Sequence, residues 1–340
     1  MSQTPDVSVD SPARDTPRLL AVHAHPDDES SKGAATLASY ADRGASVMVV
    51  SCTGGEAGSV LNEAFTARAR AERDMGGLRR SEMAAAQKAL GIEHAWLGFV
   101  DSGMPEDGVV DSSSFAGVPL RTAAAPLVRL VRRFRPHVII SYDENGGYPH
   151  PDHIRAHQVA VEAFRAAGDP GEYPGLGAAW SVAKLYYDRV FSGQKLRAIT
   201  EHLRSLNPED PRLSFVDEMM QVDENAPFLA TTRIVISGFH HRRDAALRAH
   251  ASQVAPDNVF FFLPHDVIDL AWPTDDFQLM ESRVEMSIPE TDLFAGIDVV
   301  DLAPGPLAVV SPVPSDTARS EPSAAVADSA IGADEGRGSA

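Results

Sequence analysis

The sequence predicts an α/β protein with a Rossmann-like, mostly parallel sheet flanked by helices and an active site at the carboxyl ends of the strands. Short apolar runs alternate with amphipathic stretches, a pattern typical of strands joined by right-handed helical crossovers. Several of these runs end in clusters of His, Asp and Glu. Because parallel strands open at one edge of a sheet, the clusters are expected to meet there.

Four short apolar runs predict the main strands. They span residues 19–24, 47–52, 95–99 and 138–142. Continuous apolar runs of this length are typical of strands covered on both faces. Helices are predicted between the strands, among them residues 30–41, which Gly44 terminates, and residues 81–90, where apolar side chains recur at helical spacing.

The pattern becomes less regular after Gly168, where residues 169–177 are rich in Gly and Pro. The elements predicted beyond them are a strand at 184–191, a helix at 196–206, a polar loop at 207–228, a strand at 231–237 and a helix at 242–253. The alternation therefore resumes after an irregular insertion.

Both ends of the 340-residue chain are polar and lack periodicity. Such segments bury too little apolar surface to offset chain entropy. We therefore expect a disordered N-terminal tail at residues 1–17, a single α/β metal-hydrolase domain at 18–303 and a disordered C-terminal tail at 304–340. A domain of this size is within the range of one α/β core.

The formal net charge of −18 disfavours nucleic acid and anionic membranes as partners, because both attract basic surfaces. A small-molecule substrate is favoured. The single cysteine, Cys52, excludes an intrachain disulfide and is expected to be a small core residue. Without a signal-peptide pattern or an apolar run of about 20 residues, the chain is expected to be cytoplasmic, as a monomer or small homo-oligomer.

Three polar clusters follow predicted strands. The first is HPDDE at residues 25–29, the second is GGEAG at 54–58, and the third is DENGGYPHPDH at 143–153. Alone, the first cluster is also compatible with a turn or a helix cap, since Asp and Pro are favoured in both. The second His-Pro-Asp-His at another strand end makes a functional site the stronger hypothesis.

The composition of these clusters predicts a catalytic metal site. A catalytic zinc takes three protein ligands from imidazole and carboxylate groups and leaves a position open. His25, Asp28 and His153 are the predicted ligands of one Zn²⁺ per chain, although Fe²⁺ accepts the same set. Asp27, adjacent to a ligand but pointing elsewhere in a tight turn, is the predicted general base.

The third cluster supplies the remaining catalytic candidates. His150 is predicted to stabilise the oxyanion and protonate the leaving amine, and Tyr148 to donate to a carbonyl oxygen, unless its ring simply packs over the Gly-Gly turn. Asp152 is predicted to orient an imidazole or, about equally, to cap the following helix. His157 lacks the glutamate that accompanies paired zinc ligands on a helix, so a core role is expected.

Together, AHPDDESSKGA at 24–34 and YDENGGYPHPDHI at 142–154 resemble the LmbE-like/PIG-L superfamily of zinc de-N-acetylases, which hydrolyse N-acyl groups of glucosamine conjugates. The resemblance covers about residues 18–300. With TGGEAG at 53–58, WLGFVDSGMP at 96–105 and RRDAALRAHASQ at 242–253, it is similar to the branch that hydrolyses mycothiol S-conjugates. The mycothiol-biosynthetic deacetylases are the nearest alternative.

The resemblance implies a zinc amidase that cuts mycothiol S-conjugates into a mercapturic acid and glucosaminyl-inositol during detoxification. By motif position it assigns the metal, base and acid roles to the residues named above. It places sugar and inositol contacts at Glu56, Arg79 and Asp101, and Lys32 favours the amidases over the deacetylases. Residues 169–230 depart from the family pattern and are expected to reshape the substrate pocket.

Three other functions remain open from the sequence. One is deacetylation of N-acetylglucosaminyl-inositol, and another is similar amide cleavage in a natural-product pathway. The third is a metal-holding sugar-binding module without turnover. The presence of Asp27 beside the predicted ligand Asp28 argues against this last function, since binding alone needs no base.

Overall fold

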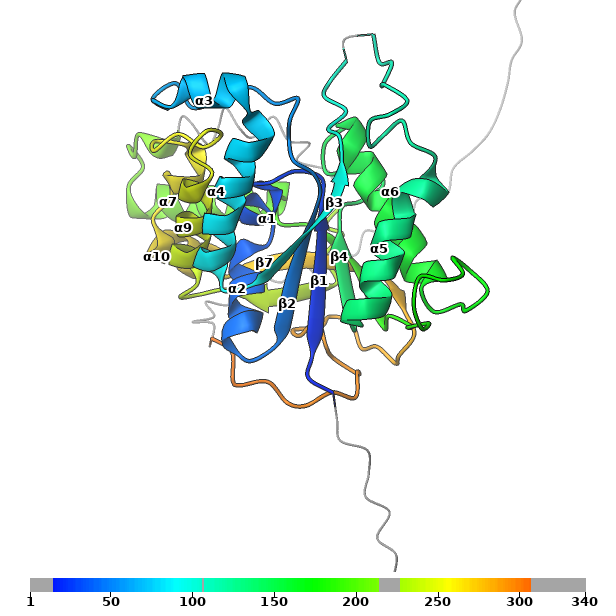
Figure 1. The fold of residues 1–340 in the computed structure, drawn as a ribbon. Coiled ribbons are helices and arrows are strands. Elements are labelled where there is room, and N and C mark those ends of the chain that lie inside the picture. The colour runs from blue at the N-terminus through cyan, green and yellow to red at the C-terminus, as the bar shows by residue number, and fades with distance from the viewer. Residues whose placement is uncertain (1–14, 106, 214–226, 307–340) are drawn as a thin grey trace, which may run out of the picture. The chain divides into compact units, whose positions relative to one another are not determined.

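The structure is a computed structural model that describes residues 15–105, 107–213 and 227–306. A seven-stranded sheet forms the centre of this described part (Figure 1). Its strand order is β3-β2-β1-β4-β5-β7-β6. The strands are β1 (Arg18–His23), β2 (Ser46–Thr53), β3 (Glu93–Phe99), β4 (Val138–Ser141), β5 (Lys184–Asp188), β6 (Thr232–Val235) and β7 (Thr274–Ser282). Strands β1 to β5 pair in parallel, whereas β7 runs antiparallel to β5 and β6. The predicted mostly parallel α/β fold is confirmed.

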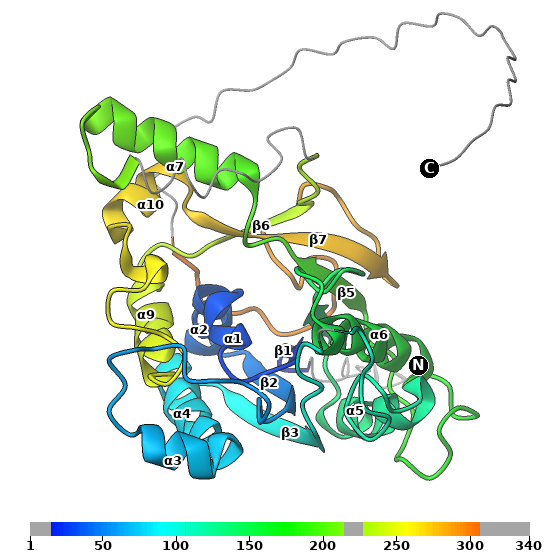
Figure 2. The same ribbon diagram turned by 90° about the horizontal axis from the view of Figure 1, so that it is seen from above.

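Helices cover both faces of the sheet. They are α1 (Asp28–Ser31), α2 (Ala34–Asp42), α3 (Arg68–Arg73), α4 (Met75–Leu90), α5 (Leu120–Phe134), α6 (Pro151–Ala166), α7 (Gly193–Leu206), α9 (His240–Ala249) and α10 (His265–Ala271), with the 3₁₀ turn η1 (Val259–Phe261). Figure 2 shows α5 and α6 on one side of β1 and β2, and α2, α4 and α9 on the other. Among the described helices, none combines the length and apolarity needed to cross a bilayer.

Alternation along β1 explains the two cores. Leu20 and Val22 belong to the cluster that packs with α5 and α6, whereas Leu19 and Ala21 belong to the cluster formed with α2 and α4. Both sets are fully or almost fully buried, which is why the strand is apolar without interruption. Cys52 is buried in the first of these cores, as predicted.

The structure corrects several predicted elements, among them two helices and one missed strand. The helix predicted at 30–41 is broken into α1 and α2 at Gly33, which adopts a positive φ of 78°. The helix predicted at 242–253 ends at Ala249, because the chain turns at His250 toward the active site. Strand β7 was not predicted, because its first half carries Asp275 and Asp276. Asp275 accepts a hydrogen bond from Thr36 in α2, and Asp276 accepts one from Trp272, which precedes the strand.

The predicted tails fall mostly outside the described residues. All described residues belong to one unit. At its two ends, Asp15 forms an isolated parallel bridge with Val299, and the side chain of Arg43 donates to the carbonyl oxygen of Ala303. Residues 214–226, within the predicted polar loop, are also outside the described part. Disorder of the tails stays a prediction.

A buried ion pair ties β5 to the segment that follows β7. Lys184 Nζ lies 2.5 Å from Glu290 Oε1, and both side chains are almost completely buried. Glu290 Oε2 accepts hydrogen bonds from Tyr186 and Thr232, so its second oxygen is also satisfied. Removal of one partner from such a pair leaves an uncompensated buried charge.

We therefore predict that Glu290→Gln lowers the free energy of unfolding by about 3 kcal/mol, because the Lys184 ammonium loses its counter-charge. Urea titration followed by circular dichroism measures the loss. The double variant Lys184→Met/Glu290→Gln should recover much of it, since no buried cation remains. Equal destabilisation in the single and double variants would show that the two charges are not coupled.

Candidate metal-dependent active site

The parallel pairing of β1 with β4 brings the first and third polar clusters together. His25 follows β1, Asp28 begins α1, and His153 lies in the first turn of α6 after β4. All three side chains are buried, and one potential ligand atom from each lies within 4.8 Å of the others. The three predicted ligands thus share one site.

Asp28 lies between the two imidazoles. Its Oδ2 is 3.6 Å from His25 Nδ1 and 3.4 Å from His153 Nε2. The other oxygen, Oδ1, lies 2.8 Å from the ammonium of Lys32. Although burial alone raises the pKa of Asp28, His153, Lys32 and His25 lower it well below its usual range. Asp28 is therefore a carboxylate, the form that a metal ligand requires.

A backbone carbonyl fixes the tautomer of His153. Its Nδ1 lies 2.9 Å from the carbonyl oxygen of Gly146, which can only accept, so Nδ1 carries a proton. Burial lowers the pKa of His153 to about 4, so the neutral ring has its lone pair on Nε2. That atom is buried and has no hydrogen-bond partner among the described residues. Tyr142 stacks on the ring at 4.5 Å.

His25 faces an excess of negative charge. Its Nε2 lies 3.4 Å from Asp152 Oδ2 and 3.6 Å from Asp101 Oδ1, and it makes no hydrogen bond within the described part of the chain. Burial alone lowers the pKa of His25, but the surrounding carboxylates raise it well above its usual value. A divalent cation would balance the same carboxylates. Two imidazoles with free nitrogens and one carboxylate fit zinc, and ferrous iron also.

Asp27 is held in a conformation that is unusual for a residue with a side chain. Its φ is 102°, and its N–H donates to Glu29 Oε2 at 2.9 Å. Arg79 lies 3.0 Å from Asp27 Oδ2 and also donates to the carbonyl oxygens of Pro26 and Gly55. Burial raises the pKa of Asp27 despite the opposing charge of Arg79, which makes the carboxylate a stronger base.

Glu29 and His250 support this turn from behind. His250 Nε2 lies 2.8 Å from Glu29 Oε1, and both side chains are fully buried. Burial alone raises the pKa of Glu29, but His250 lowers it to about 2, so Glu29 accepts as a carboxylate. Neither residue had a predicted role, although both lie within the family motifs. Their partnership spans 221 positions and is invisible locally.

His150 and Tyr148 face the same region. His150 is the N-cap of α6, and its Nδ1 accepts the N–H of Asp152, so the ring proton of the neutral form lies on Nε2. Burial and the neighbouring His25 lower the pKa of His150. Its ring centroid lies 4.7 Å from that of His25 and 6.0 Å from that of Tyr148. Tyr148 is half exposed and packs against His153.

Asp152 is not the helix cap that the sequence left open, because His150 has that position. Its carboxylate is fully buried, accepts the N–H of Ser102 at 2.9 Å and faces His25. Together with His25 and His150 it forms a second group of residues whose geometry suits a metal. His157 belongs to neither group, and its Nδ1 instead lies 3.0 Å from the carbonyl oxygen of Tyr142.

A polar cavity of about 320 Å³ opens above these residues. Arg79 and Asp101 line it, together with Gln253, which was not predicted from the sequence. Glu56 and Lys32 do not line the cavity but contact residues that do: Glu56 accepts the backbone N–H of Asp101, and Lys32 forms an ion pair with Asp28. The structure thus brings two of the four predicted substrate contacts to the wall and two to positions that support it.

Several known proteins resemble this chain in sequence. Residues 20–164 match the family model described as GlcNAc-PI de-N-acetylase (PIG-L). The chain is 44% identical over 285 residues to the mycothiol S-conjugate amidase of Streptomyces coelicolor, covering 82% of this chain and 97% of the relative. It is 41% identical over 296 residues to the 1D-myo-inositol 2-acetamido-2-deoxy-α-D-glucopyranoside deacetylase of Streptomyces scabiei, covering 82% and 90%.

Solved structures share the fold. The N,N′-diacetylchitobiose deacetylase of Pyrococcus horikoshii matches with a TM-score of 0.52 and 17% identity over 78% of this chain and 84% of that one. The 4-carboxy-2-hydroxymuconate hydratase of Pseudomonas putida matches with a TM-score of 0.53 and 17% identity over 80% and 99%. Because a deacetylase and a hydratase match equally, the fold alone does not specify the reaction.

The contact between Gly146 and His153 generates a prediction. Gly146 has a φ of 72°, and a Cβ there would lie 2.5 Å from His153 Cβ. Gly146→Ala should displace the imidazole and weaken Zn²⁺ binding by about 10- to 100-fold, the usual effect of disturbing the support of a ligand. Competition with a chromogenic chelator measures the affinity.

Gly147→Ala is the matched control. Gly147 has a similar φ of 74°, but a Cβ there would meet only Lys32 Cε, at 4.0 Å. It carries the same backbone strain without the clash, so its Zn²⁺ affinity should stay within a few-fold of wild type. Equal affinities for both variants would contradict the role assigned to the Gly146 contact.

Proposed function

Because the chain belongs to the GlcNAc-PI de-N-acetylase (PIG-L) family, we propose that it hydrolyses the amide bond of mycothiol S-conjugates with the help of a bound zinc ion. Family membership makes it a hydrolase of amide C–N bonds, as the motifs predicted. The proposed products are a mercapturic acid and glucosaminyl-inositol. The observation that carries this substrate is the similarity to the Streptomyces coelicolor amidase across nearly all of that protein's length.

His25, Asp28 and His153 would hold the metal ion. His25 Nδ1 and His153 Nε2 both face the ionised carboxylate of Asp28, and these three groups are the donors that such an ion needs. When bound, the ion supplies Lewis acidity for the scissile carbonyl and for an attacking water. Zinc is the metal proposed, and ferrous iron is compatible with the same ligands.

Asp27 acts as the general base in this proposal. Its carboxylate lines the polar cavity beside Asp28, and its raised pKa favours acceptance of a proton from the attacking water. Arg79 donates to Asp27 Oδ2, and Glu29 accepts the backbone N–H of Asp27. These two contacts fix the carboxylate, so its other oxygen can face the attacking water without further reorganisation. The water oxygen then adds to the carbonyl carbon.

His150 and Tyr148 act on the other side of the reacting carbon. Either can donate a hydrogen bond to the developing oxyanion, His150 from Nε2 and Tyr148 from its hydroxyl. When the C–N bond breaks, the leaving nitrogen takes the proton that Asp27 accepted from the water and departs as an amine, because the lowered pKa of His150 keeps that ring a neutral hydrogen-bond donor. Asp152 faces His25 and, on this proposal, orients that imidazole rather than touching the substrate.

The polar cavity suits the sugar and inositol of the substrate. Arg79, Asp101 and Gln253 present charged and amide groups toward it, which match hydroxyl-rich ligands. Glu56 and Lys32 would support this wall through Asp101 and Asp28. The second candidate is deacetylation of N-acetylglucosaminyl-inositol, favoured by the similarity to the Streptomyces scabiei deacetylase, because both reactions cut an amide at the same sugar nitrogen.

A product assay separates these candidates. The full-length protein with Zn²⁺ is expected to convert a mycothiol S-conjugate to equal amounts of mercapturic acid and glucosaminyl-inositol, detected by mass spectrometry. Its kcat/KM should exceed that for acetate release from N-acetylglucosaminyl-inositol. Chelator-treated protein serves as the control and should regain turnover on addition of Zn²⁺ or Fe²⁺. Acetate release without conjugate cleavage would replace this proposal with the deacetylase function.

Asp27→Asn tests the base. Asn tolerates the positive φ of this position, but its amide cannot accept a proton, so kcat should fall by about 100-fold or more. Zinc content should stay at the wild-type level, as measured by mass spectrometry, because the three ligands are unchanged. Asp28→Asn is the comparison and should lose the metal as well. Wild-type kcat in Asp27→Asn would remove the base from the mechanism.

A further inference from the structure

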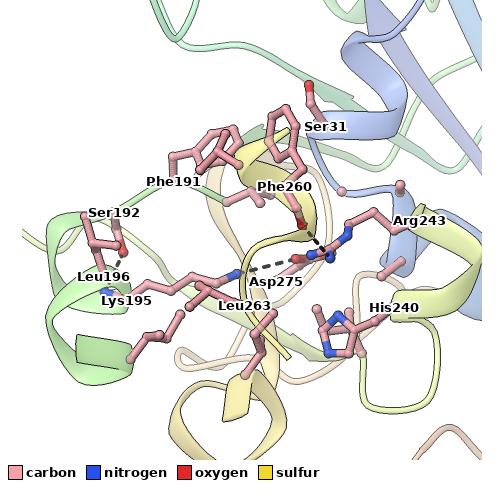
Figure 3. Close-up of a pocket in the computed structure, with 18 of the residues that line it drawn as sticks. Ser31, Phe191, Ser192, Lys195, Leu196, His240, Arg243, Phe260, Leu263 and Asp275 are labelled. Atoms are coloured by element: carbon pink, nitrogen blue, oxygen red, sulfur yellow. Dashed lines mark hydrogen bonds and ion pairs between the residues drawn. The ribbon is translucent and has the colours of Figure 1, made fainter. Parts of the chain in front are cut away.

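A second cavity, of about 420 Å³, lies beside the active site (Figure 3). Its walls come from the start of α2, the segment before α7, η1 and the loop ahead of α10. Part of this wall, including Phe191 and Leu196, lies in the irregular stretch that the sequence predicts to shape the substrate pocket. None of its residues belongs to the metal cluster.

The two cavities share a thin wall. Asp28 lines the polar cavity, and Ser31, three residues further on α1, lines the second one. Likewise, Tyr148 lines the polar cavity and the adjacent Gly147 lines the second. Only one helical turn and one loop therefore separate the metal cluster from the second cavity. A ligand group long enough to pass this turn and loop would reach the second cavity.

The second cavity is apolar where the first is polar. Aliphatic and aromatic side chains form most of its surface: Val190, Phe191, Leu196, Ile199, Ile236, Val259, Phe260, Phe262, Leu263 and Ile268. Phe191 and Phe260 form an aromatic pair, with ring centroids 6.2 Å apart. In Figure 3 they lie in the upper part of the view together with Ser31, while Leu263 and His240 lie in the lower part. This aromatic and aliphatic surface suits an apolar ligand group.

The charged residues of this cavity are already paired. Lys195 donates to the carbonyl oxygen of Thr274 and lies 3.7 Å from Asp275, which accepts from Thr36. Arg243 pairs with Asp244, and His240 Nε2 with Asp269, whereas His240 Nδ1 is buried without a hydrogen-bond partner among the described residues. These partners leave little unsatisfied charge for a polar ligand to meet. Apart from that nitrogen, the lining offers mainly apolar surface to a ligand.

We propose that the second cavity binds the apolar S-substituent of the substrate. The inference rests on the proposed function, in which the acyl half of the amide is a cysteine bearing a group on sulfur. With the sugar half in the polar cavity, the acyl half extends to the opposite side of the reacting carbon. Once past Ser31 and Gly147, the S-substituent would meet Phe191 and Phe260, which line the same cavity. An acetyl group is too short to fill this space.

A substrate pair tests the proposal. Conjugates of mycothiol with S-methyl and S-benzyl groups share the scissile amide and the sugar and differ only in apolar size. Wild-type protein should show a kcat/KM at least about 10-fold higher for the S-benzyl conjugate, the scale on which apolar pockets discriminate. Phe191→Ala and Phe260→Ala should each reduce the S-benzyl value by about 10-fold and the S-methyl value by less than about 2-fold.

Phe261→Ala is the matched control. Phe261 is adjacent to Phe260 and similarly half-buried in η1, but it contacts Arg248 and does not line the cavity. It should leave the ratio of the two kcat/KM values at the wild-type level. Phe191 is 62% exposed, so its truncation is not expected to disturb folding, and a thermal melt of each variant checks this.

The possible failures are distinguishable. An unchanged substrate ratio in both cavity variants, or equal losses for both conjugates, would overturn the cavity assignment while leaving amide hydrolysis intact. Absence of wild-type turnover on either conjugate would overturn the proposed function. In that event calorimetry with N-acetyl-S-benzylcysteine still decides the cavity. Weaker binding by about 10-fold in Phe260→Ala but not in Phe261→Ala supports it, and equal affinities or no binding overturn it.

Discussion

The parallel pairing of β1 with β4 is the constraint on which the active site depends. The two His-Pro-Asp motifs follow these two strands, and only a parallel pairing brings both motifs to the same edge of the sheet. The register, with Ala21 opposite Ile140, sets where each strand ends relative to the other, and so where the residues that follow the two strands meet. A shift by one residue would exchange Leu20 and Val22 with Leu19 and Ala21 between the two cores, and would so disturb the packing of both. The cores therefore fix the positions of the metal ligands.

Around this edge, the structure holds groups that would be unfavourable on their own. A positive φ at Asp27 costs about 1 to 3 kcal/mol, and three buried carboxylates around one imidazole repel one another. Glu29, His250 and Arg79 stabilise the strained turn, and Lys32 balances Asp28. The remaining negative charge is what attracts a divalent cation. The strained backbone of Asp27 and the excess of carboxylates both occur at the site of the proposed chemistry.

The sequence predicted the fold class, four parallel strands and the convergence of His25, Asp28 and His153, because apolar periodicity and motif position are local properties. It missed strand β7 and the roles of His250 and Gln253, whose meaning depends on partners that only folding supplies. Asp275 and Asp276 hid the strand character of β7, because aspartate is typical of loops and the hydrogen bonds that allow these two to be buried cannot be seen in the sequence. Arg79 was expected at the substrate, but its contact with Asp27 joins residues 52 positions apart.

The second cavity changes how substrate preference is understood. On the proposed function, the mycothiol conjugate and the N-acetylated sugar would both place the same sugar nitrogen at the metal cluster, so the polar cavity would not distinguish them. The groups that differ lie on the acyl side, where α1 and Gly147 separate the ligands from apolar surface. Lys32 pairs with Asp28 and lies close to Gly147, so it connects the proposed ligand set with the loop that lines the second cavity. Preference for a large or a small acyl group is therefore a property of the wall and the space behind it, whereas bond cleavage is a property of the metal cluster.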